Sequence, residues 1–341
     1  MKKIFIFIPF VNNGGAEKAA INLCNNLSSN LKIFLIILNK KNLKKGIVHK
    51  NVTIISLRKN RLLFSFYSLG KVLVKFKPDY ILSFMYANSI VSTLSKILFL
   101  SKSKLIFCIQ NNPTEIIKNS KNQAYTKILF LTFKLCTIFS EKIITCSKNL
   151  CDDVKKFCFK KSNVISIYNP VINSDFLKNS LIFDKDLNKF RKKFKNILAI
   201  GRLEDQKNFE FLIRSFKKIN YSNKFKLFII GSGSKFKELQ RLVLSLKMNN
   251  QIFLLGEKKN VYNFIKKCDF FVLTSKWEGL GNVLVESLYF NRNIISSNCE
   301  FGPSEILKDG KIGHLYKNDN VRDFIDKFSF PKKKKYNKIR L

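Results

Sequence analysis

Two acidic residues mark the chemistry that this chain of 341 residues could do. Glu278 and Glu286 lie eight positions apart, the first in a predicted loop and the second in the predicted helix that follows it. Gly279 and Gly281 lie between them, where glycine lets the backbone come close to a ligand. The free amides at the start of such a helix bind anions. The pattern predicts a site for a ligand with phosphates at one end and sugar hydroxyls at the other.

Two cations follow an earlier predicted strand. Arg202 and Lys207 lie in the loop Gly201–Asn208, directly after a strand over 197–200. A planar guanidinium and a point-charge ammonium can together bind two phosphate groups without a metal ion. In a chain this rich in lysine, the alternative is a pair of solvated surface cations. The glutamates downstream favour the phosphate site.

Glycine turns occur at two other predicted strand-to-helix junctions. Gly14 and Gly15 come directly after the first strand, which indicates either a phosphate or acceptor loop or only a tight turn. Gly231 and Gly233 form a G-x-G turn after a later strand. That turn lacks the third glycine and the acidic residue of a dinucleotide fingerprint, so a nicotinamide cofactor is not expected.

The E-x7-E spacing of Glu278 and Glu286, with its strand-to-helix setting, resembles the donor-sugar site of family 4 retaining glycosyltransferases. The segment 302–307 is similar to the G-P-x-E-I-L segment of transferases that build bacterial polysaccharides, lipopolysaccharides and lipid-linked oligosaccharides, hexosyl- and N-acetylgalactosaminyltransferases among them. The resemblance is strong over 196–317 and diffuse before that range. It implies the GT-B fold, in which two Rossmann-like parallel-sheet domains face a cleft, and a nucleotide-sugar donor, expected to be a UDP-sugar.

The resemblance also implies roles for individual residues. Arg202 and Lys207 would hold the donor diphosphate and neutralise charge on the leaving group. Glu278 would lie close to the hydroxyls of the donor sugar, and Glu286 would accept hydrogen bonds from the ribose. Glu278, Arg202 and Lys207 are therefore the expected catalytic residues. The expected donor-binding residues are Gly14, Gly15, Gly231, Gly279, Leu280, Gly281, Asn282, Val283 and Glu286.

One feature of the family is missing from this sequence. Many members carry a histidine after a strand of the first domain, at a place that corresponds to residues 83–88 of this chain. That segment contains no histidine, and the only histidines of the chain are His49 and His314. No general base can be named, which suits the front-face retaining transfer proposed for the family, in which the donor phosphate receives the acceptor's proton. The cleft-facing loops contain no D-x-D, and Asp152 and Asp153 are expected on a solvated helix face. We therefore expect transfer without a metal or any other cofactor.

These residues need elements that place them at one edge of a sheet. Apolar runs and helical patterns alternate along the chain, which predicts an α/β fold of parallel sheets with helices on both faces. Ligands of such sheets bind at the carboxyl ends of the strands. The predicted strands are 4–10, 32–38, 80–85, 105–110, 142–146, 164–168, 197–200, 226–230, 251–255, 270–274 and 293–296. The predicted helices are 16–27, 62–76, 89–99, 125–139, 149–157, 208–219, 235–247, 261–267, 282–290 and 303–307.

A polar, charged segment interrupts this alternation and predicts a domain boundary. The first domain, on the acceptor side, is expected over 1–172, and the nucleotide-sugar-binding domain over 196–330. A linker at 173–195 joins them, and a basic tail at 331–341 follows. The apolar run at the start of the chain has no cleavage site after it, so it is interpreted as a strand and not as a signal peptide.

A net charge of +40 results from 63 basic and 23 acidic residues. The lysines are scattered and no zinc-finger, RNA-recognition or basic-zipper pattern is present, so nucleic acid is not the expected partner. An anionic membrane surface suits the charge better, because each lysine near such a surface adds about 1 kcal/mol. The apolar segment 124–139 is too short to span a bilayer. It is either a half-buried helix of the first domain or a surface helix that touches lipid.

Together these observations predict a retaining glycosyltransferase that moves a hexose or N-acetylhexosamine from a UDP-sugar to a bacterial surface glycan or a polyprenyl-diphosphate-linked acceptor. The eight cysteines show no C-x-x-C pair and indicate thiols in a reducing cytosol. The expected location is therefore cytoplasmic, peripheral at the inner face of the cytoplasmic membrane. Two alternatives stay open: a UDP-sugar epimerase of GT-B type, and a noncatalytic polyanion- or membrane-binding protein on the same fold.

Overall fold

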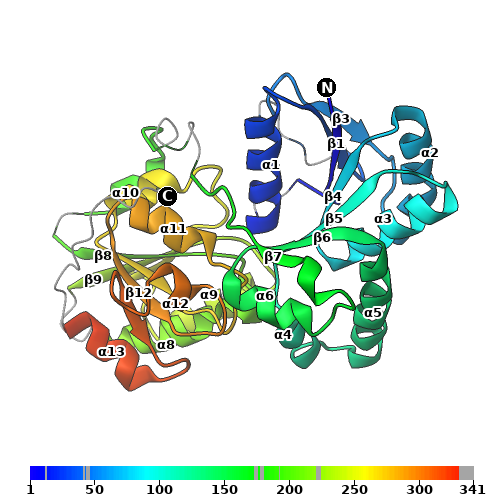
Figure 1. Cartoon of the computed structure of the whole chain (residues 1–341). Helices are drawn as coiled ribbons and strands as arrows, with labels where there is room; N and C mark the ends of the chain where they lie inside the picture. The colour runs from blue at the N-terminus through cyan, green and yellow to red at the C-terminus, as the bar shows by residue number, and fades with distance from the viewer. Residues whose placement is uncertain are drawn as a thin grey trace. The chain divides into compact units, whose positions relative to one another are not determined.

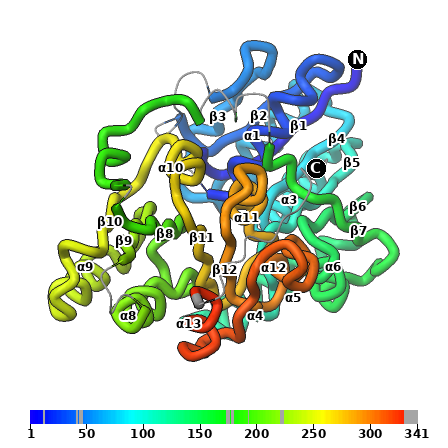
Figure 2. The backbone as a smooth tube through the Cα atoms, turned by 90° about the vertical axis from the view of Figure 1, so that its left-hand side faces the viewer, coloured from blue at the N-terminus to red at the C-terminus, as the bar shows by residue number. Residues whose placement is uncertain are grey.

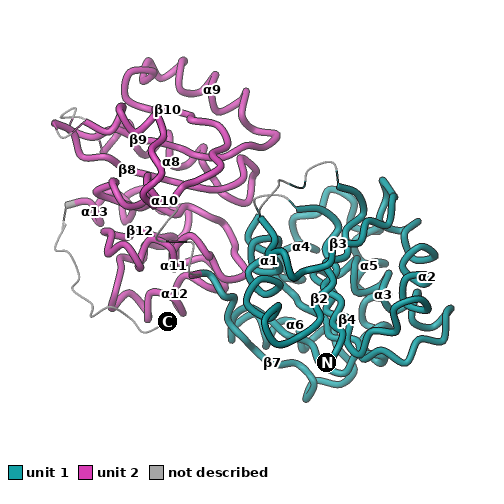
Figure 3. The backbone as a smooth tube through the Cα atoms, turned by 90° about the horizontal axis from the view of Figure 1, so that it is seen from above, with its two compact units in different colours: residues 1–171 teal, residues 172–341 magenta. Residues whose placement is uncertain are grey.

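A computed structural model of the chain describes residues 1–11, 14–40, 43, 47–172, 176, 180–191, 193–219 and 224–329. The chain divides into two compact units, Met1–Val171 and Ile172–Leu341, drawn in teal and magenta in Figure 3. Each unit holds one parallel sheet with helices, which confirms the predicted α/β class (Figure 1). The predicted basic tail and residues 173–175, 177–179 and 192 of the predicted linker lie outside the described residues.

Unit 1 is built on a seven-stranded sheet in the order β3-β2-β1-β4-β5-β6-β7. Its strands are β1 (Lys3–Phe7), β2 (Lys32–Ile37), β3 (Thr53–Ser56), β4 (Tyr80–Phe84), β5 (Lys104–Ile109), β6 (Ser140–Thr145) and β7 (Val164–Ser166). Its helices are α1 (Gly15–Leu27), α2 (Phe66–Phe76), α3 (Tyr86–Leu98), α4 (Pro113–Lys118), α5 (Gln123–Cys136) and α6 (Lys148–Lys155). Short 3-10 turns cover Leu63–Ser65, Thr137–Phe139 and Lys161–Asn163.

The central strands of unit 1 are apolar on both faces because helices cover both faces of the sheet. Ile6 and Leu35 pack in one cluster with the buried side of α1. The neighbouring Phe5 and Phe34 point the other way, toward Phe76 of α2, with ring centroids 6.2 and 5.2 Å from its ring. Figure 1 accordingly shows α1 on one side of β1 and β4 and α2 with α3 on the other.

Unit 2 is built on a six-stranded sheet in the order β10-β9-β8-β11-β12-β13, and Figure 2 shows the first five strands side by side. Its strands are β8 (Lys195–Ile200), β9 (Phe225–Ile230), β10 (Ile252–Leu254), β11 (Phe270–Leu273), β12 (Asn293–Ser297) and β13 (His314–Tyr316). Its helices are α8 (Phe209–Ile219), α9 (Phe236–Ser245), α10 (Tyr262–Lys267), α11 (Asn282–Tyr289), α12 (Pro303–Ile306) and α13 (Val321–Ser329). Short 3-10 turns cover Lys185–Lys189 and Asp205–Lys207.

Strand β8 shows how the core of unit 2 is divided by its sheet. Ile197 and Ala199 pack with α8, α9 and α13 on one face. Leu198 and Ile200 pack with α10 and α11 on the other. Part of the predicted linker, 173–195, also belongs to this second cluster, because Leu187 is buried there and the ring of Phe190 stacks on Phe228 at 4.0 Å. These two residues of the predicted linker therefore pack into the core of unit 2.

Among the α-helices and strands of the described residues, four were not predicted, namely β3, β13, α4 and α13. The two strands have four and three residues, too few to show a period of two. The two helices did carry a sequence signal, since Asn112 accepts the amide of Glu115 at 2.9 Å and Asn320 accepts that of Asp323 at 2.9 Å. Asparagine three residues before an acidic residue is a capping pattern that marks a helix start.

Some predicted element ends were also wrong. The first strand ends at Phe7 and not at residue 10, where Pro9 has no amide hydrogen to give to a neighbouring strand. The last strand of unit 1 ends at Ser166 and not at residue 168. The helix predicted over 62–76 begins with a 3-10 turn and becomes α-helical at Phe66.

Candidate active site

The candidate site is formed where loops at the carboxyl ends of β8, β11 and β12 meet. The amide of Lys276, after β11, donates to the carbonyl of Gln206, after β8, at 2.8 Å. On the other side, Ser297 Oγ donates to the carbonyl of Ser275 at 2.7 Å, and Trp277 forms an isolated parallel bridge with Glu300. The loop that carries the first predicted glutamate is thus held between two others.

Lys207 and Glu278, two of the predicted catalytic residues, form an ion pair in this structure. Lys207 Nζ lies 2.5 Å from Glu278 Oε1, and the side chains are only 15% and 8% exposed. Ser275 Oγ donates to the same carboxylate oxygen at 2.5 Å. A lysine ammonium has three donors, so Lys207 can bind this carboxylate and an anionic ligand together. The sequence predicted both residues but not this contact, which joins positions 71 apart.

Gln206 connects the third predicted catalytic residue to the same loop. Arg202 Nη2 donates to Gln206 Oε1 at 3.1 Å, and Gln206 Nε2 donates to the carbonyl of Trp277 at 2.9 Å. Arg202 itself is exposed. The amide of Gln206 therefore orients an exposed guanidinium on the loop next to Glu278. The sequence analysis did not select Gln206, because no charge or periodicity distinguishes it from a surface glutamine.

Two glycines after β9 let the backbone of the Arg202 loop come close. A Cβ at Gly231, where φ is +151°, would lie 1.8 Å from the carbonyl oxygen of Gly201. A Cβ at Gly233 would lie 2.4 Å from that of Leu203. Leu203 also donates to the carbonyl of Ser232 at 2.8 Å. The G-x-G turn thus packs directly against the loop that carries Arg202 and Lys207. The sequence analysis predicted Gly231 as a donor-binding residue but did not predict this packing.

Helix α11 begins directly after the loop with Glu278. Gly281 is its N-cap with φ +90°, and its carbonyl accepts the amide of Leu284 at 2.8 Å. Gly302, with φ +91°, approaches the same loop so closely that a Cβ would lie 2.1 Å from the carbonyl oxygen of Leu280. Only glycine adopts these angles without strain. The start of α11, with Asn282 and Val283 half-buried, is therefore fixed by two glycine positions.

Glu286, the second predicted glutamate, lies inside α11 and is 2% exposed. Burial raises the pKa of Tyr262 of α10, and the negative charge of Glu286 raises it further. The second effect shows that the two side chains are near one another. Tyr262 in turn packs on Phe176, with ring centroids 4.2 Å apart. Glu286 is therefore a buried side chain and not a solvated surface acid.

Cys299 lies next to the ion pair and adds a neutral wall. Burial, with a smaller contribution from Glu278, raises the pKa of its thiol to about 12. The thiol is therefore protonated at neutral pH and acts as a small apolar group. All eight cysteines of the chain are buried thiols.

Comparisons with known proteins agree with this geometry. Residues 182–335 match the family described as glycosyl transferases group 1. An uncharacterised glycosyltransferase of Methanocaldococcus jannaschii is 34% identical over 265 residues, which are 73% of this chain and 64% of that relative. The chain carries a group 1 glycosyltransferase domain. Its match spans less than two thirds of the length of this relative.

Two other proteins are similar to this chain over nearly its whole length. One is the Campylobacter jejuni N-acetylgalactosamine-N,N'-diacetylbacillosaminyl-diphospho-undecaprenol 4-alpha-N-acetylgalactosaminyltransferase, 29% identical over 331 residues, 94% of this chain and 87% of that protein. The other is the crystal structure of Anabaena HepE in complex with UDP and glucose, with a TM-score of 0.79, 16% identity and coverage of 96% of this chain and 88% of that chain. The structural similarity shows that the fold is GT-B.

The predicted first loop of the chain lies in unit 1, whereas the other predicted site residues lie in unit 2. Gly14 is the N-cap of α1 in an extended conformation, and Gly15 is the first residue of that helix. The carboxylate of Glu17 lies against the turn, so that a Cβ at Gly14 would be 2.3 Å from Glu17 Oε2. Negative charge in the first turn suits a helix start. A phosphate at this turn requires Glu17 to move.

The position of the missing family histidine is the junction of β4 and α3. Met85 lies there with φ +73°, a conformation that costs energy in residues other than glycine. Tyr86, the next residue, is buried and donates its hydroxyl to the carbonyl of Asn111 at 2.7 Å. The prediction that Asp153 lies on a solvated face was wrong. Asp153 is 3% exposed, and its buried carboxylate accepts a hydrogen bond from the hydroxyl of Thr114 at 2.7 Å. The side chain of Asp152 is exposed.

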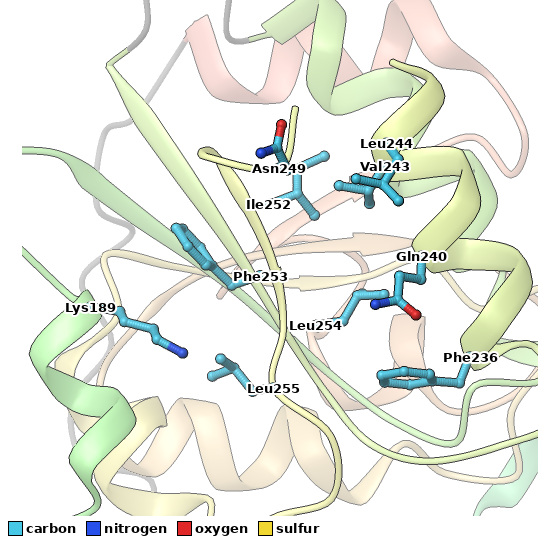
Figure 4. Close-up of a pocket in the computed structure, with 10 residues that line it drawn as sticks. All are labelled: Lys189, Phe236, Gln240, Val243, Leu244, Asn249, Ile252, Phe253, Leu254 and Leu255. Atoms are coloured by element: carbon cyan, nitrogen blue, oxygen red, sulfur yellow. The ribbon is translucent and has the colours of Figure 1, made fainter. Parts of the chain in front are cut away.

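A pocket elsewhere in unit 2 is separate from these residues. It is a hollow of about 220 Å³ between α9 and the edge strand β10, shown in Figure 4. Its lining is mostly apolar and includes Phe236, Val243 and Phe253. None of the predicted catalytic or donor-binding residues lines it.

Proposed function

We propose that this protein is a retaining glycosyltransferase that moves a hexose or N-acetylhexosamine from a UDP-sugar to a bacterial glycan or lipid-linked acceptor. The observation that carries the proposal is the group formed by Arg202, Gln206, Lys207 and Glu278 beside the start of α11. It combines two cations, one carboxylate and a helix N-terminus. The cations and helix amides match a diphosphate, and the carboxylate matches sugar hydroxyls.

In this proposal the cations act on the leaving group. Negative charge develops on the donor diphosphate as the bond to the sugar breaks, and preorganised positive groups stabilise that charge. Lys207 is fixed for this role by Glu278, and Arg202 by Gln206. The carboxylate of Glu278 is shared between Lys207 and a sugar hydroxyl. The donor phosphate then takes the acceptor's proton, so that no separate base is required.

The acceptor is proposed to be linked to a polyprenyl diphosphate and to bind to unit 1. The Campylobacter relative acts, by its name, on a diphospho-undecaprenol acceptor. Such an acceptor lies in a membrane, which places the protein at the inner face of the cytoplasmic membrane in this proposal. Among the described residues, no helix is long and apolar enough to cross a bilayer.

The experiment that tests the function is turnover of nucleotide sugars by the purified full-length chain. We expect UDP to be released from a UDP-sugar when a lipid-linked glycan acceptor is present, and the anomeric configuration of the donor to be kept in the product. The rate should be the same with EDTA, because Arg202, Lys207 and the helix amides supply the positive charge. Among the described residues there is also no group of three metal-ligating side chains.

Three results would contradict these statements. UDP release without any acceptor, together with an isomerised sugar, would indicate an epimerase. No turnover of any nucleotide sugar would indicate a noncatalytic binding protein. Activity that EDTA abolishes and only magnesium or manganese restores would show that the phosphate site contains a metal.

Replacing Glu286 by glutamine should weaken UDP binding. The carboxylate is proposed to accept the ribose hydroxyls, and a hydrogen bond to a charged group contributes about 1.5–3 kcal/mol, or roughly a 10- to 150-fold change in Kd. Titration calorimetry with UDP measures this directly. Glu238→Gln is a matched control, because Glu238 is a half-exposed helix acid of the same unit. UDP affinity equal to that of the wild type would show that Glu286 is only structural.

A further inference from the structure

Helix α5 of unit 1 is apolar on two sides, of which only one is covered. Phe130 and Phe133 are buried and pack around Tyr86, with ring centroids 4.7 and 4.8 Å from its ring. On the opposite side, Ile128, Leu131 and Leu135 are 64%, 62% and 51% exposed. A helix that is apolar all round is normally buried on all sides. In the described structure, the outer side of α5 is not.

Helix α3, which packs against α5, buries several small polar side chains and exposes leucines on its outer side. Beside Ile90 and Val91, its buried positions hold small hydroxyl side chains, such as Ser92 and Ser95, both 0% exposed. These hydroxyls find partners inside the unit, since Ser92 Oγ pairs with Ser83 Oγ at 2.6 Å and Ser95 Oγ donates to the carbonyl of Phe66 at 2.8 Å. The outward positions hold leucines, with Leu98 60% exposed. Solvent alone does not favour this arrangement.

Exposed apolar side chains occur on these two adjacent helices and on the 3-10 turn that follows α5. We call them together the outer apolar face and define it by Leu94, Leu98, Ile128, Leu131, Leu135 and Ile138, each at least 40% exposed. Figures 1 and 3 both place α3 and α5 next to each other, together with α2. Single exposed leucines are ordinary on soluble proteins, whereas a continuous set on adjacent helices marks an interaction surface.

Charge around this face decides which partner it fits. The segment 58–104, which includes α2 and α3, has nine basic residues and one acidic residue. The segment 121–161, which includes α5, has nine basic and three acidic residues. Lys71, Lys75 and Lys127 are exposed on α2 and α5 themselves. Two copies of such a surface repel one another, whereas a surface of anionic lipid attracts it.

We propose that the outer apolar face docks on a bilayer that contains anionic lipid. The leucines and isoleucines enter the boundary between headgroups and acyl chains, and the surrounding lysines contact the lipid phosphates. Neither helix has to cross the bilayer. The proposal deepens the function proposed above and rests on it in one respect, because a lipid-linked acceptor is presented in the membrane that this face would bind.

Vesicle flotation with the full-length chain tests the docking. We expect the wild type to float with vesicles of phosphatidylglycerol and phosphatidylcholine, to float much less with phosphatidylcholine alone, and to be released by high salt. Leu131→Glu combined with Leu135→Glu should reduce binding to anionic vesicles by at least about tenfold, because two carboxylates would enter the apolar boundary. Leu244→Glu on α9 is the matched control, since Leu244 is 57% exposed but lies in unit 2.

Three results would overturn the proposal: no flotation of the wild type, equal flotation of the double variant and the wild type, or a dimer in gel filtration that the double variant abolishes. The last result would show that the face binds a second copy. The comparison of variants requires that their thermal unfolding midpoints equal that of the wild type. If a variant is destabilised, release of the wild type from anionic vesicles by high salt tests the docking instead.

UDP binding and turnover on a detergent-solubilised acceptor report on the proposed function separately. The double variant should retain both and lose only turnover of an acceptor embedded in vesicles. Vesicle binding without nucleotide-sugar turnover would contradict the proposed function and leave the docking supported.

Discussion

Replacing Lys207 by alanine should lower kcat by about 10²–10³, because one preorganised group that stabilises charge in the transition state contributes about 3–4 kcal/mol. Lys207 is a partly buried cation of the site, with its side chain 15% exposed and its Nζ 2.5 Å from Glu278 Oε1. Its stem passes close to Gly201, where a Cβ would lie 3.1 Å from three of its carbons. The ammonium is therefore fixed in position before a ligand binds. Steady-state turnover of a UDP-sugar measures the effect.

The same substitution also leaves a buried carboxylate without its cation, which costs about 3–5 kcal/mol of stability. Two controls separate this effect from catalysis. Lys207→Met combined with Glu278→Gln removes both charges, so it should recover much of the stability but not the turnover. Lys258→Ala breaks another partly buried pair, with Asp184 at 3.2 Å, and should reduce stability with little effect on kcat. Wild-type kcat in folded Lys207→Ala protein would refute the role of this residue.

Replacing Gly231 by alanine should destabilise unit 2 by more than about 3 kcal/mol. The added Cβ would lie 1.8 Å from the carbonyl oxygen of Gly201, and φ is +151°, so both a clash between backbones and dihedral strain arise. The loops that follow β8 and β9 must move apart to remove the clash. Urea unfolding, followed by the fluorescence of the only tryptophan, Trp277, measures the loss in the same unit.

Gly256→Ala is the control for the strain alone. Gly256 has φ +67°, but a Cβ there has no atom within 4 Å. It should cost only about 1–2 kcal/mol, the usual penalty for a left-handed residue with a side chain. If Gly231→Ala is no more destabilising than Gly256→Ala, the close packing of the two loops is not required for stability.

The fold class and most of the elements could be predicted from the amino-acid pattern. Strands such as 32–38 and 226–230 are continuous apolar runs, and α8 repeats apolar residues at helical spacing, so local composition was enough to identify them. The resemblance to the family also led to the prediction that Arg202, Lys207 and Glu278 are catalytic. The positions of these motifs after strands then predicted that they lie at one edge of a sheet. The hydrogen bonds between the loops after β8 and β11 confirm this for unit 2.

The contacts between these residues are visible only in the tertiary structure. The ion pair between Lys207 and Glu278 joins positions 71 apart, and Gln206 is recognisable as a bridge only when both loops are present. The close approach of Gly231 to Gly201 is likewise a contact between two loops. Local pattern reports burial and dihedral preference within one segment. It does not report which side chain of another segment will complete a buried charge.

The outer apolar face is another feature that the sequence predicted only in part. The apolar segment 124–139 predicted a helix but left open whether it was half-buried or touched lipid. The structure shows that one side of α5 is packed and that the other, with Leu131 62% exposed, is not. In α3, Ser92 and Ser95 are buried beside Val91, whereas Leu94 and Leu98 are exposed, which the sequence alone did not predict. Exposure depends on which neighbours fold over a helix, and those neighbours come from distant parts of the chain.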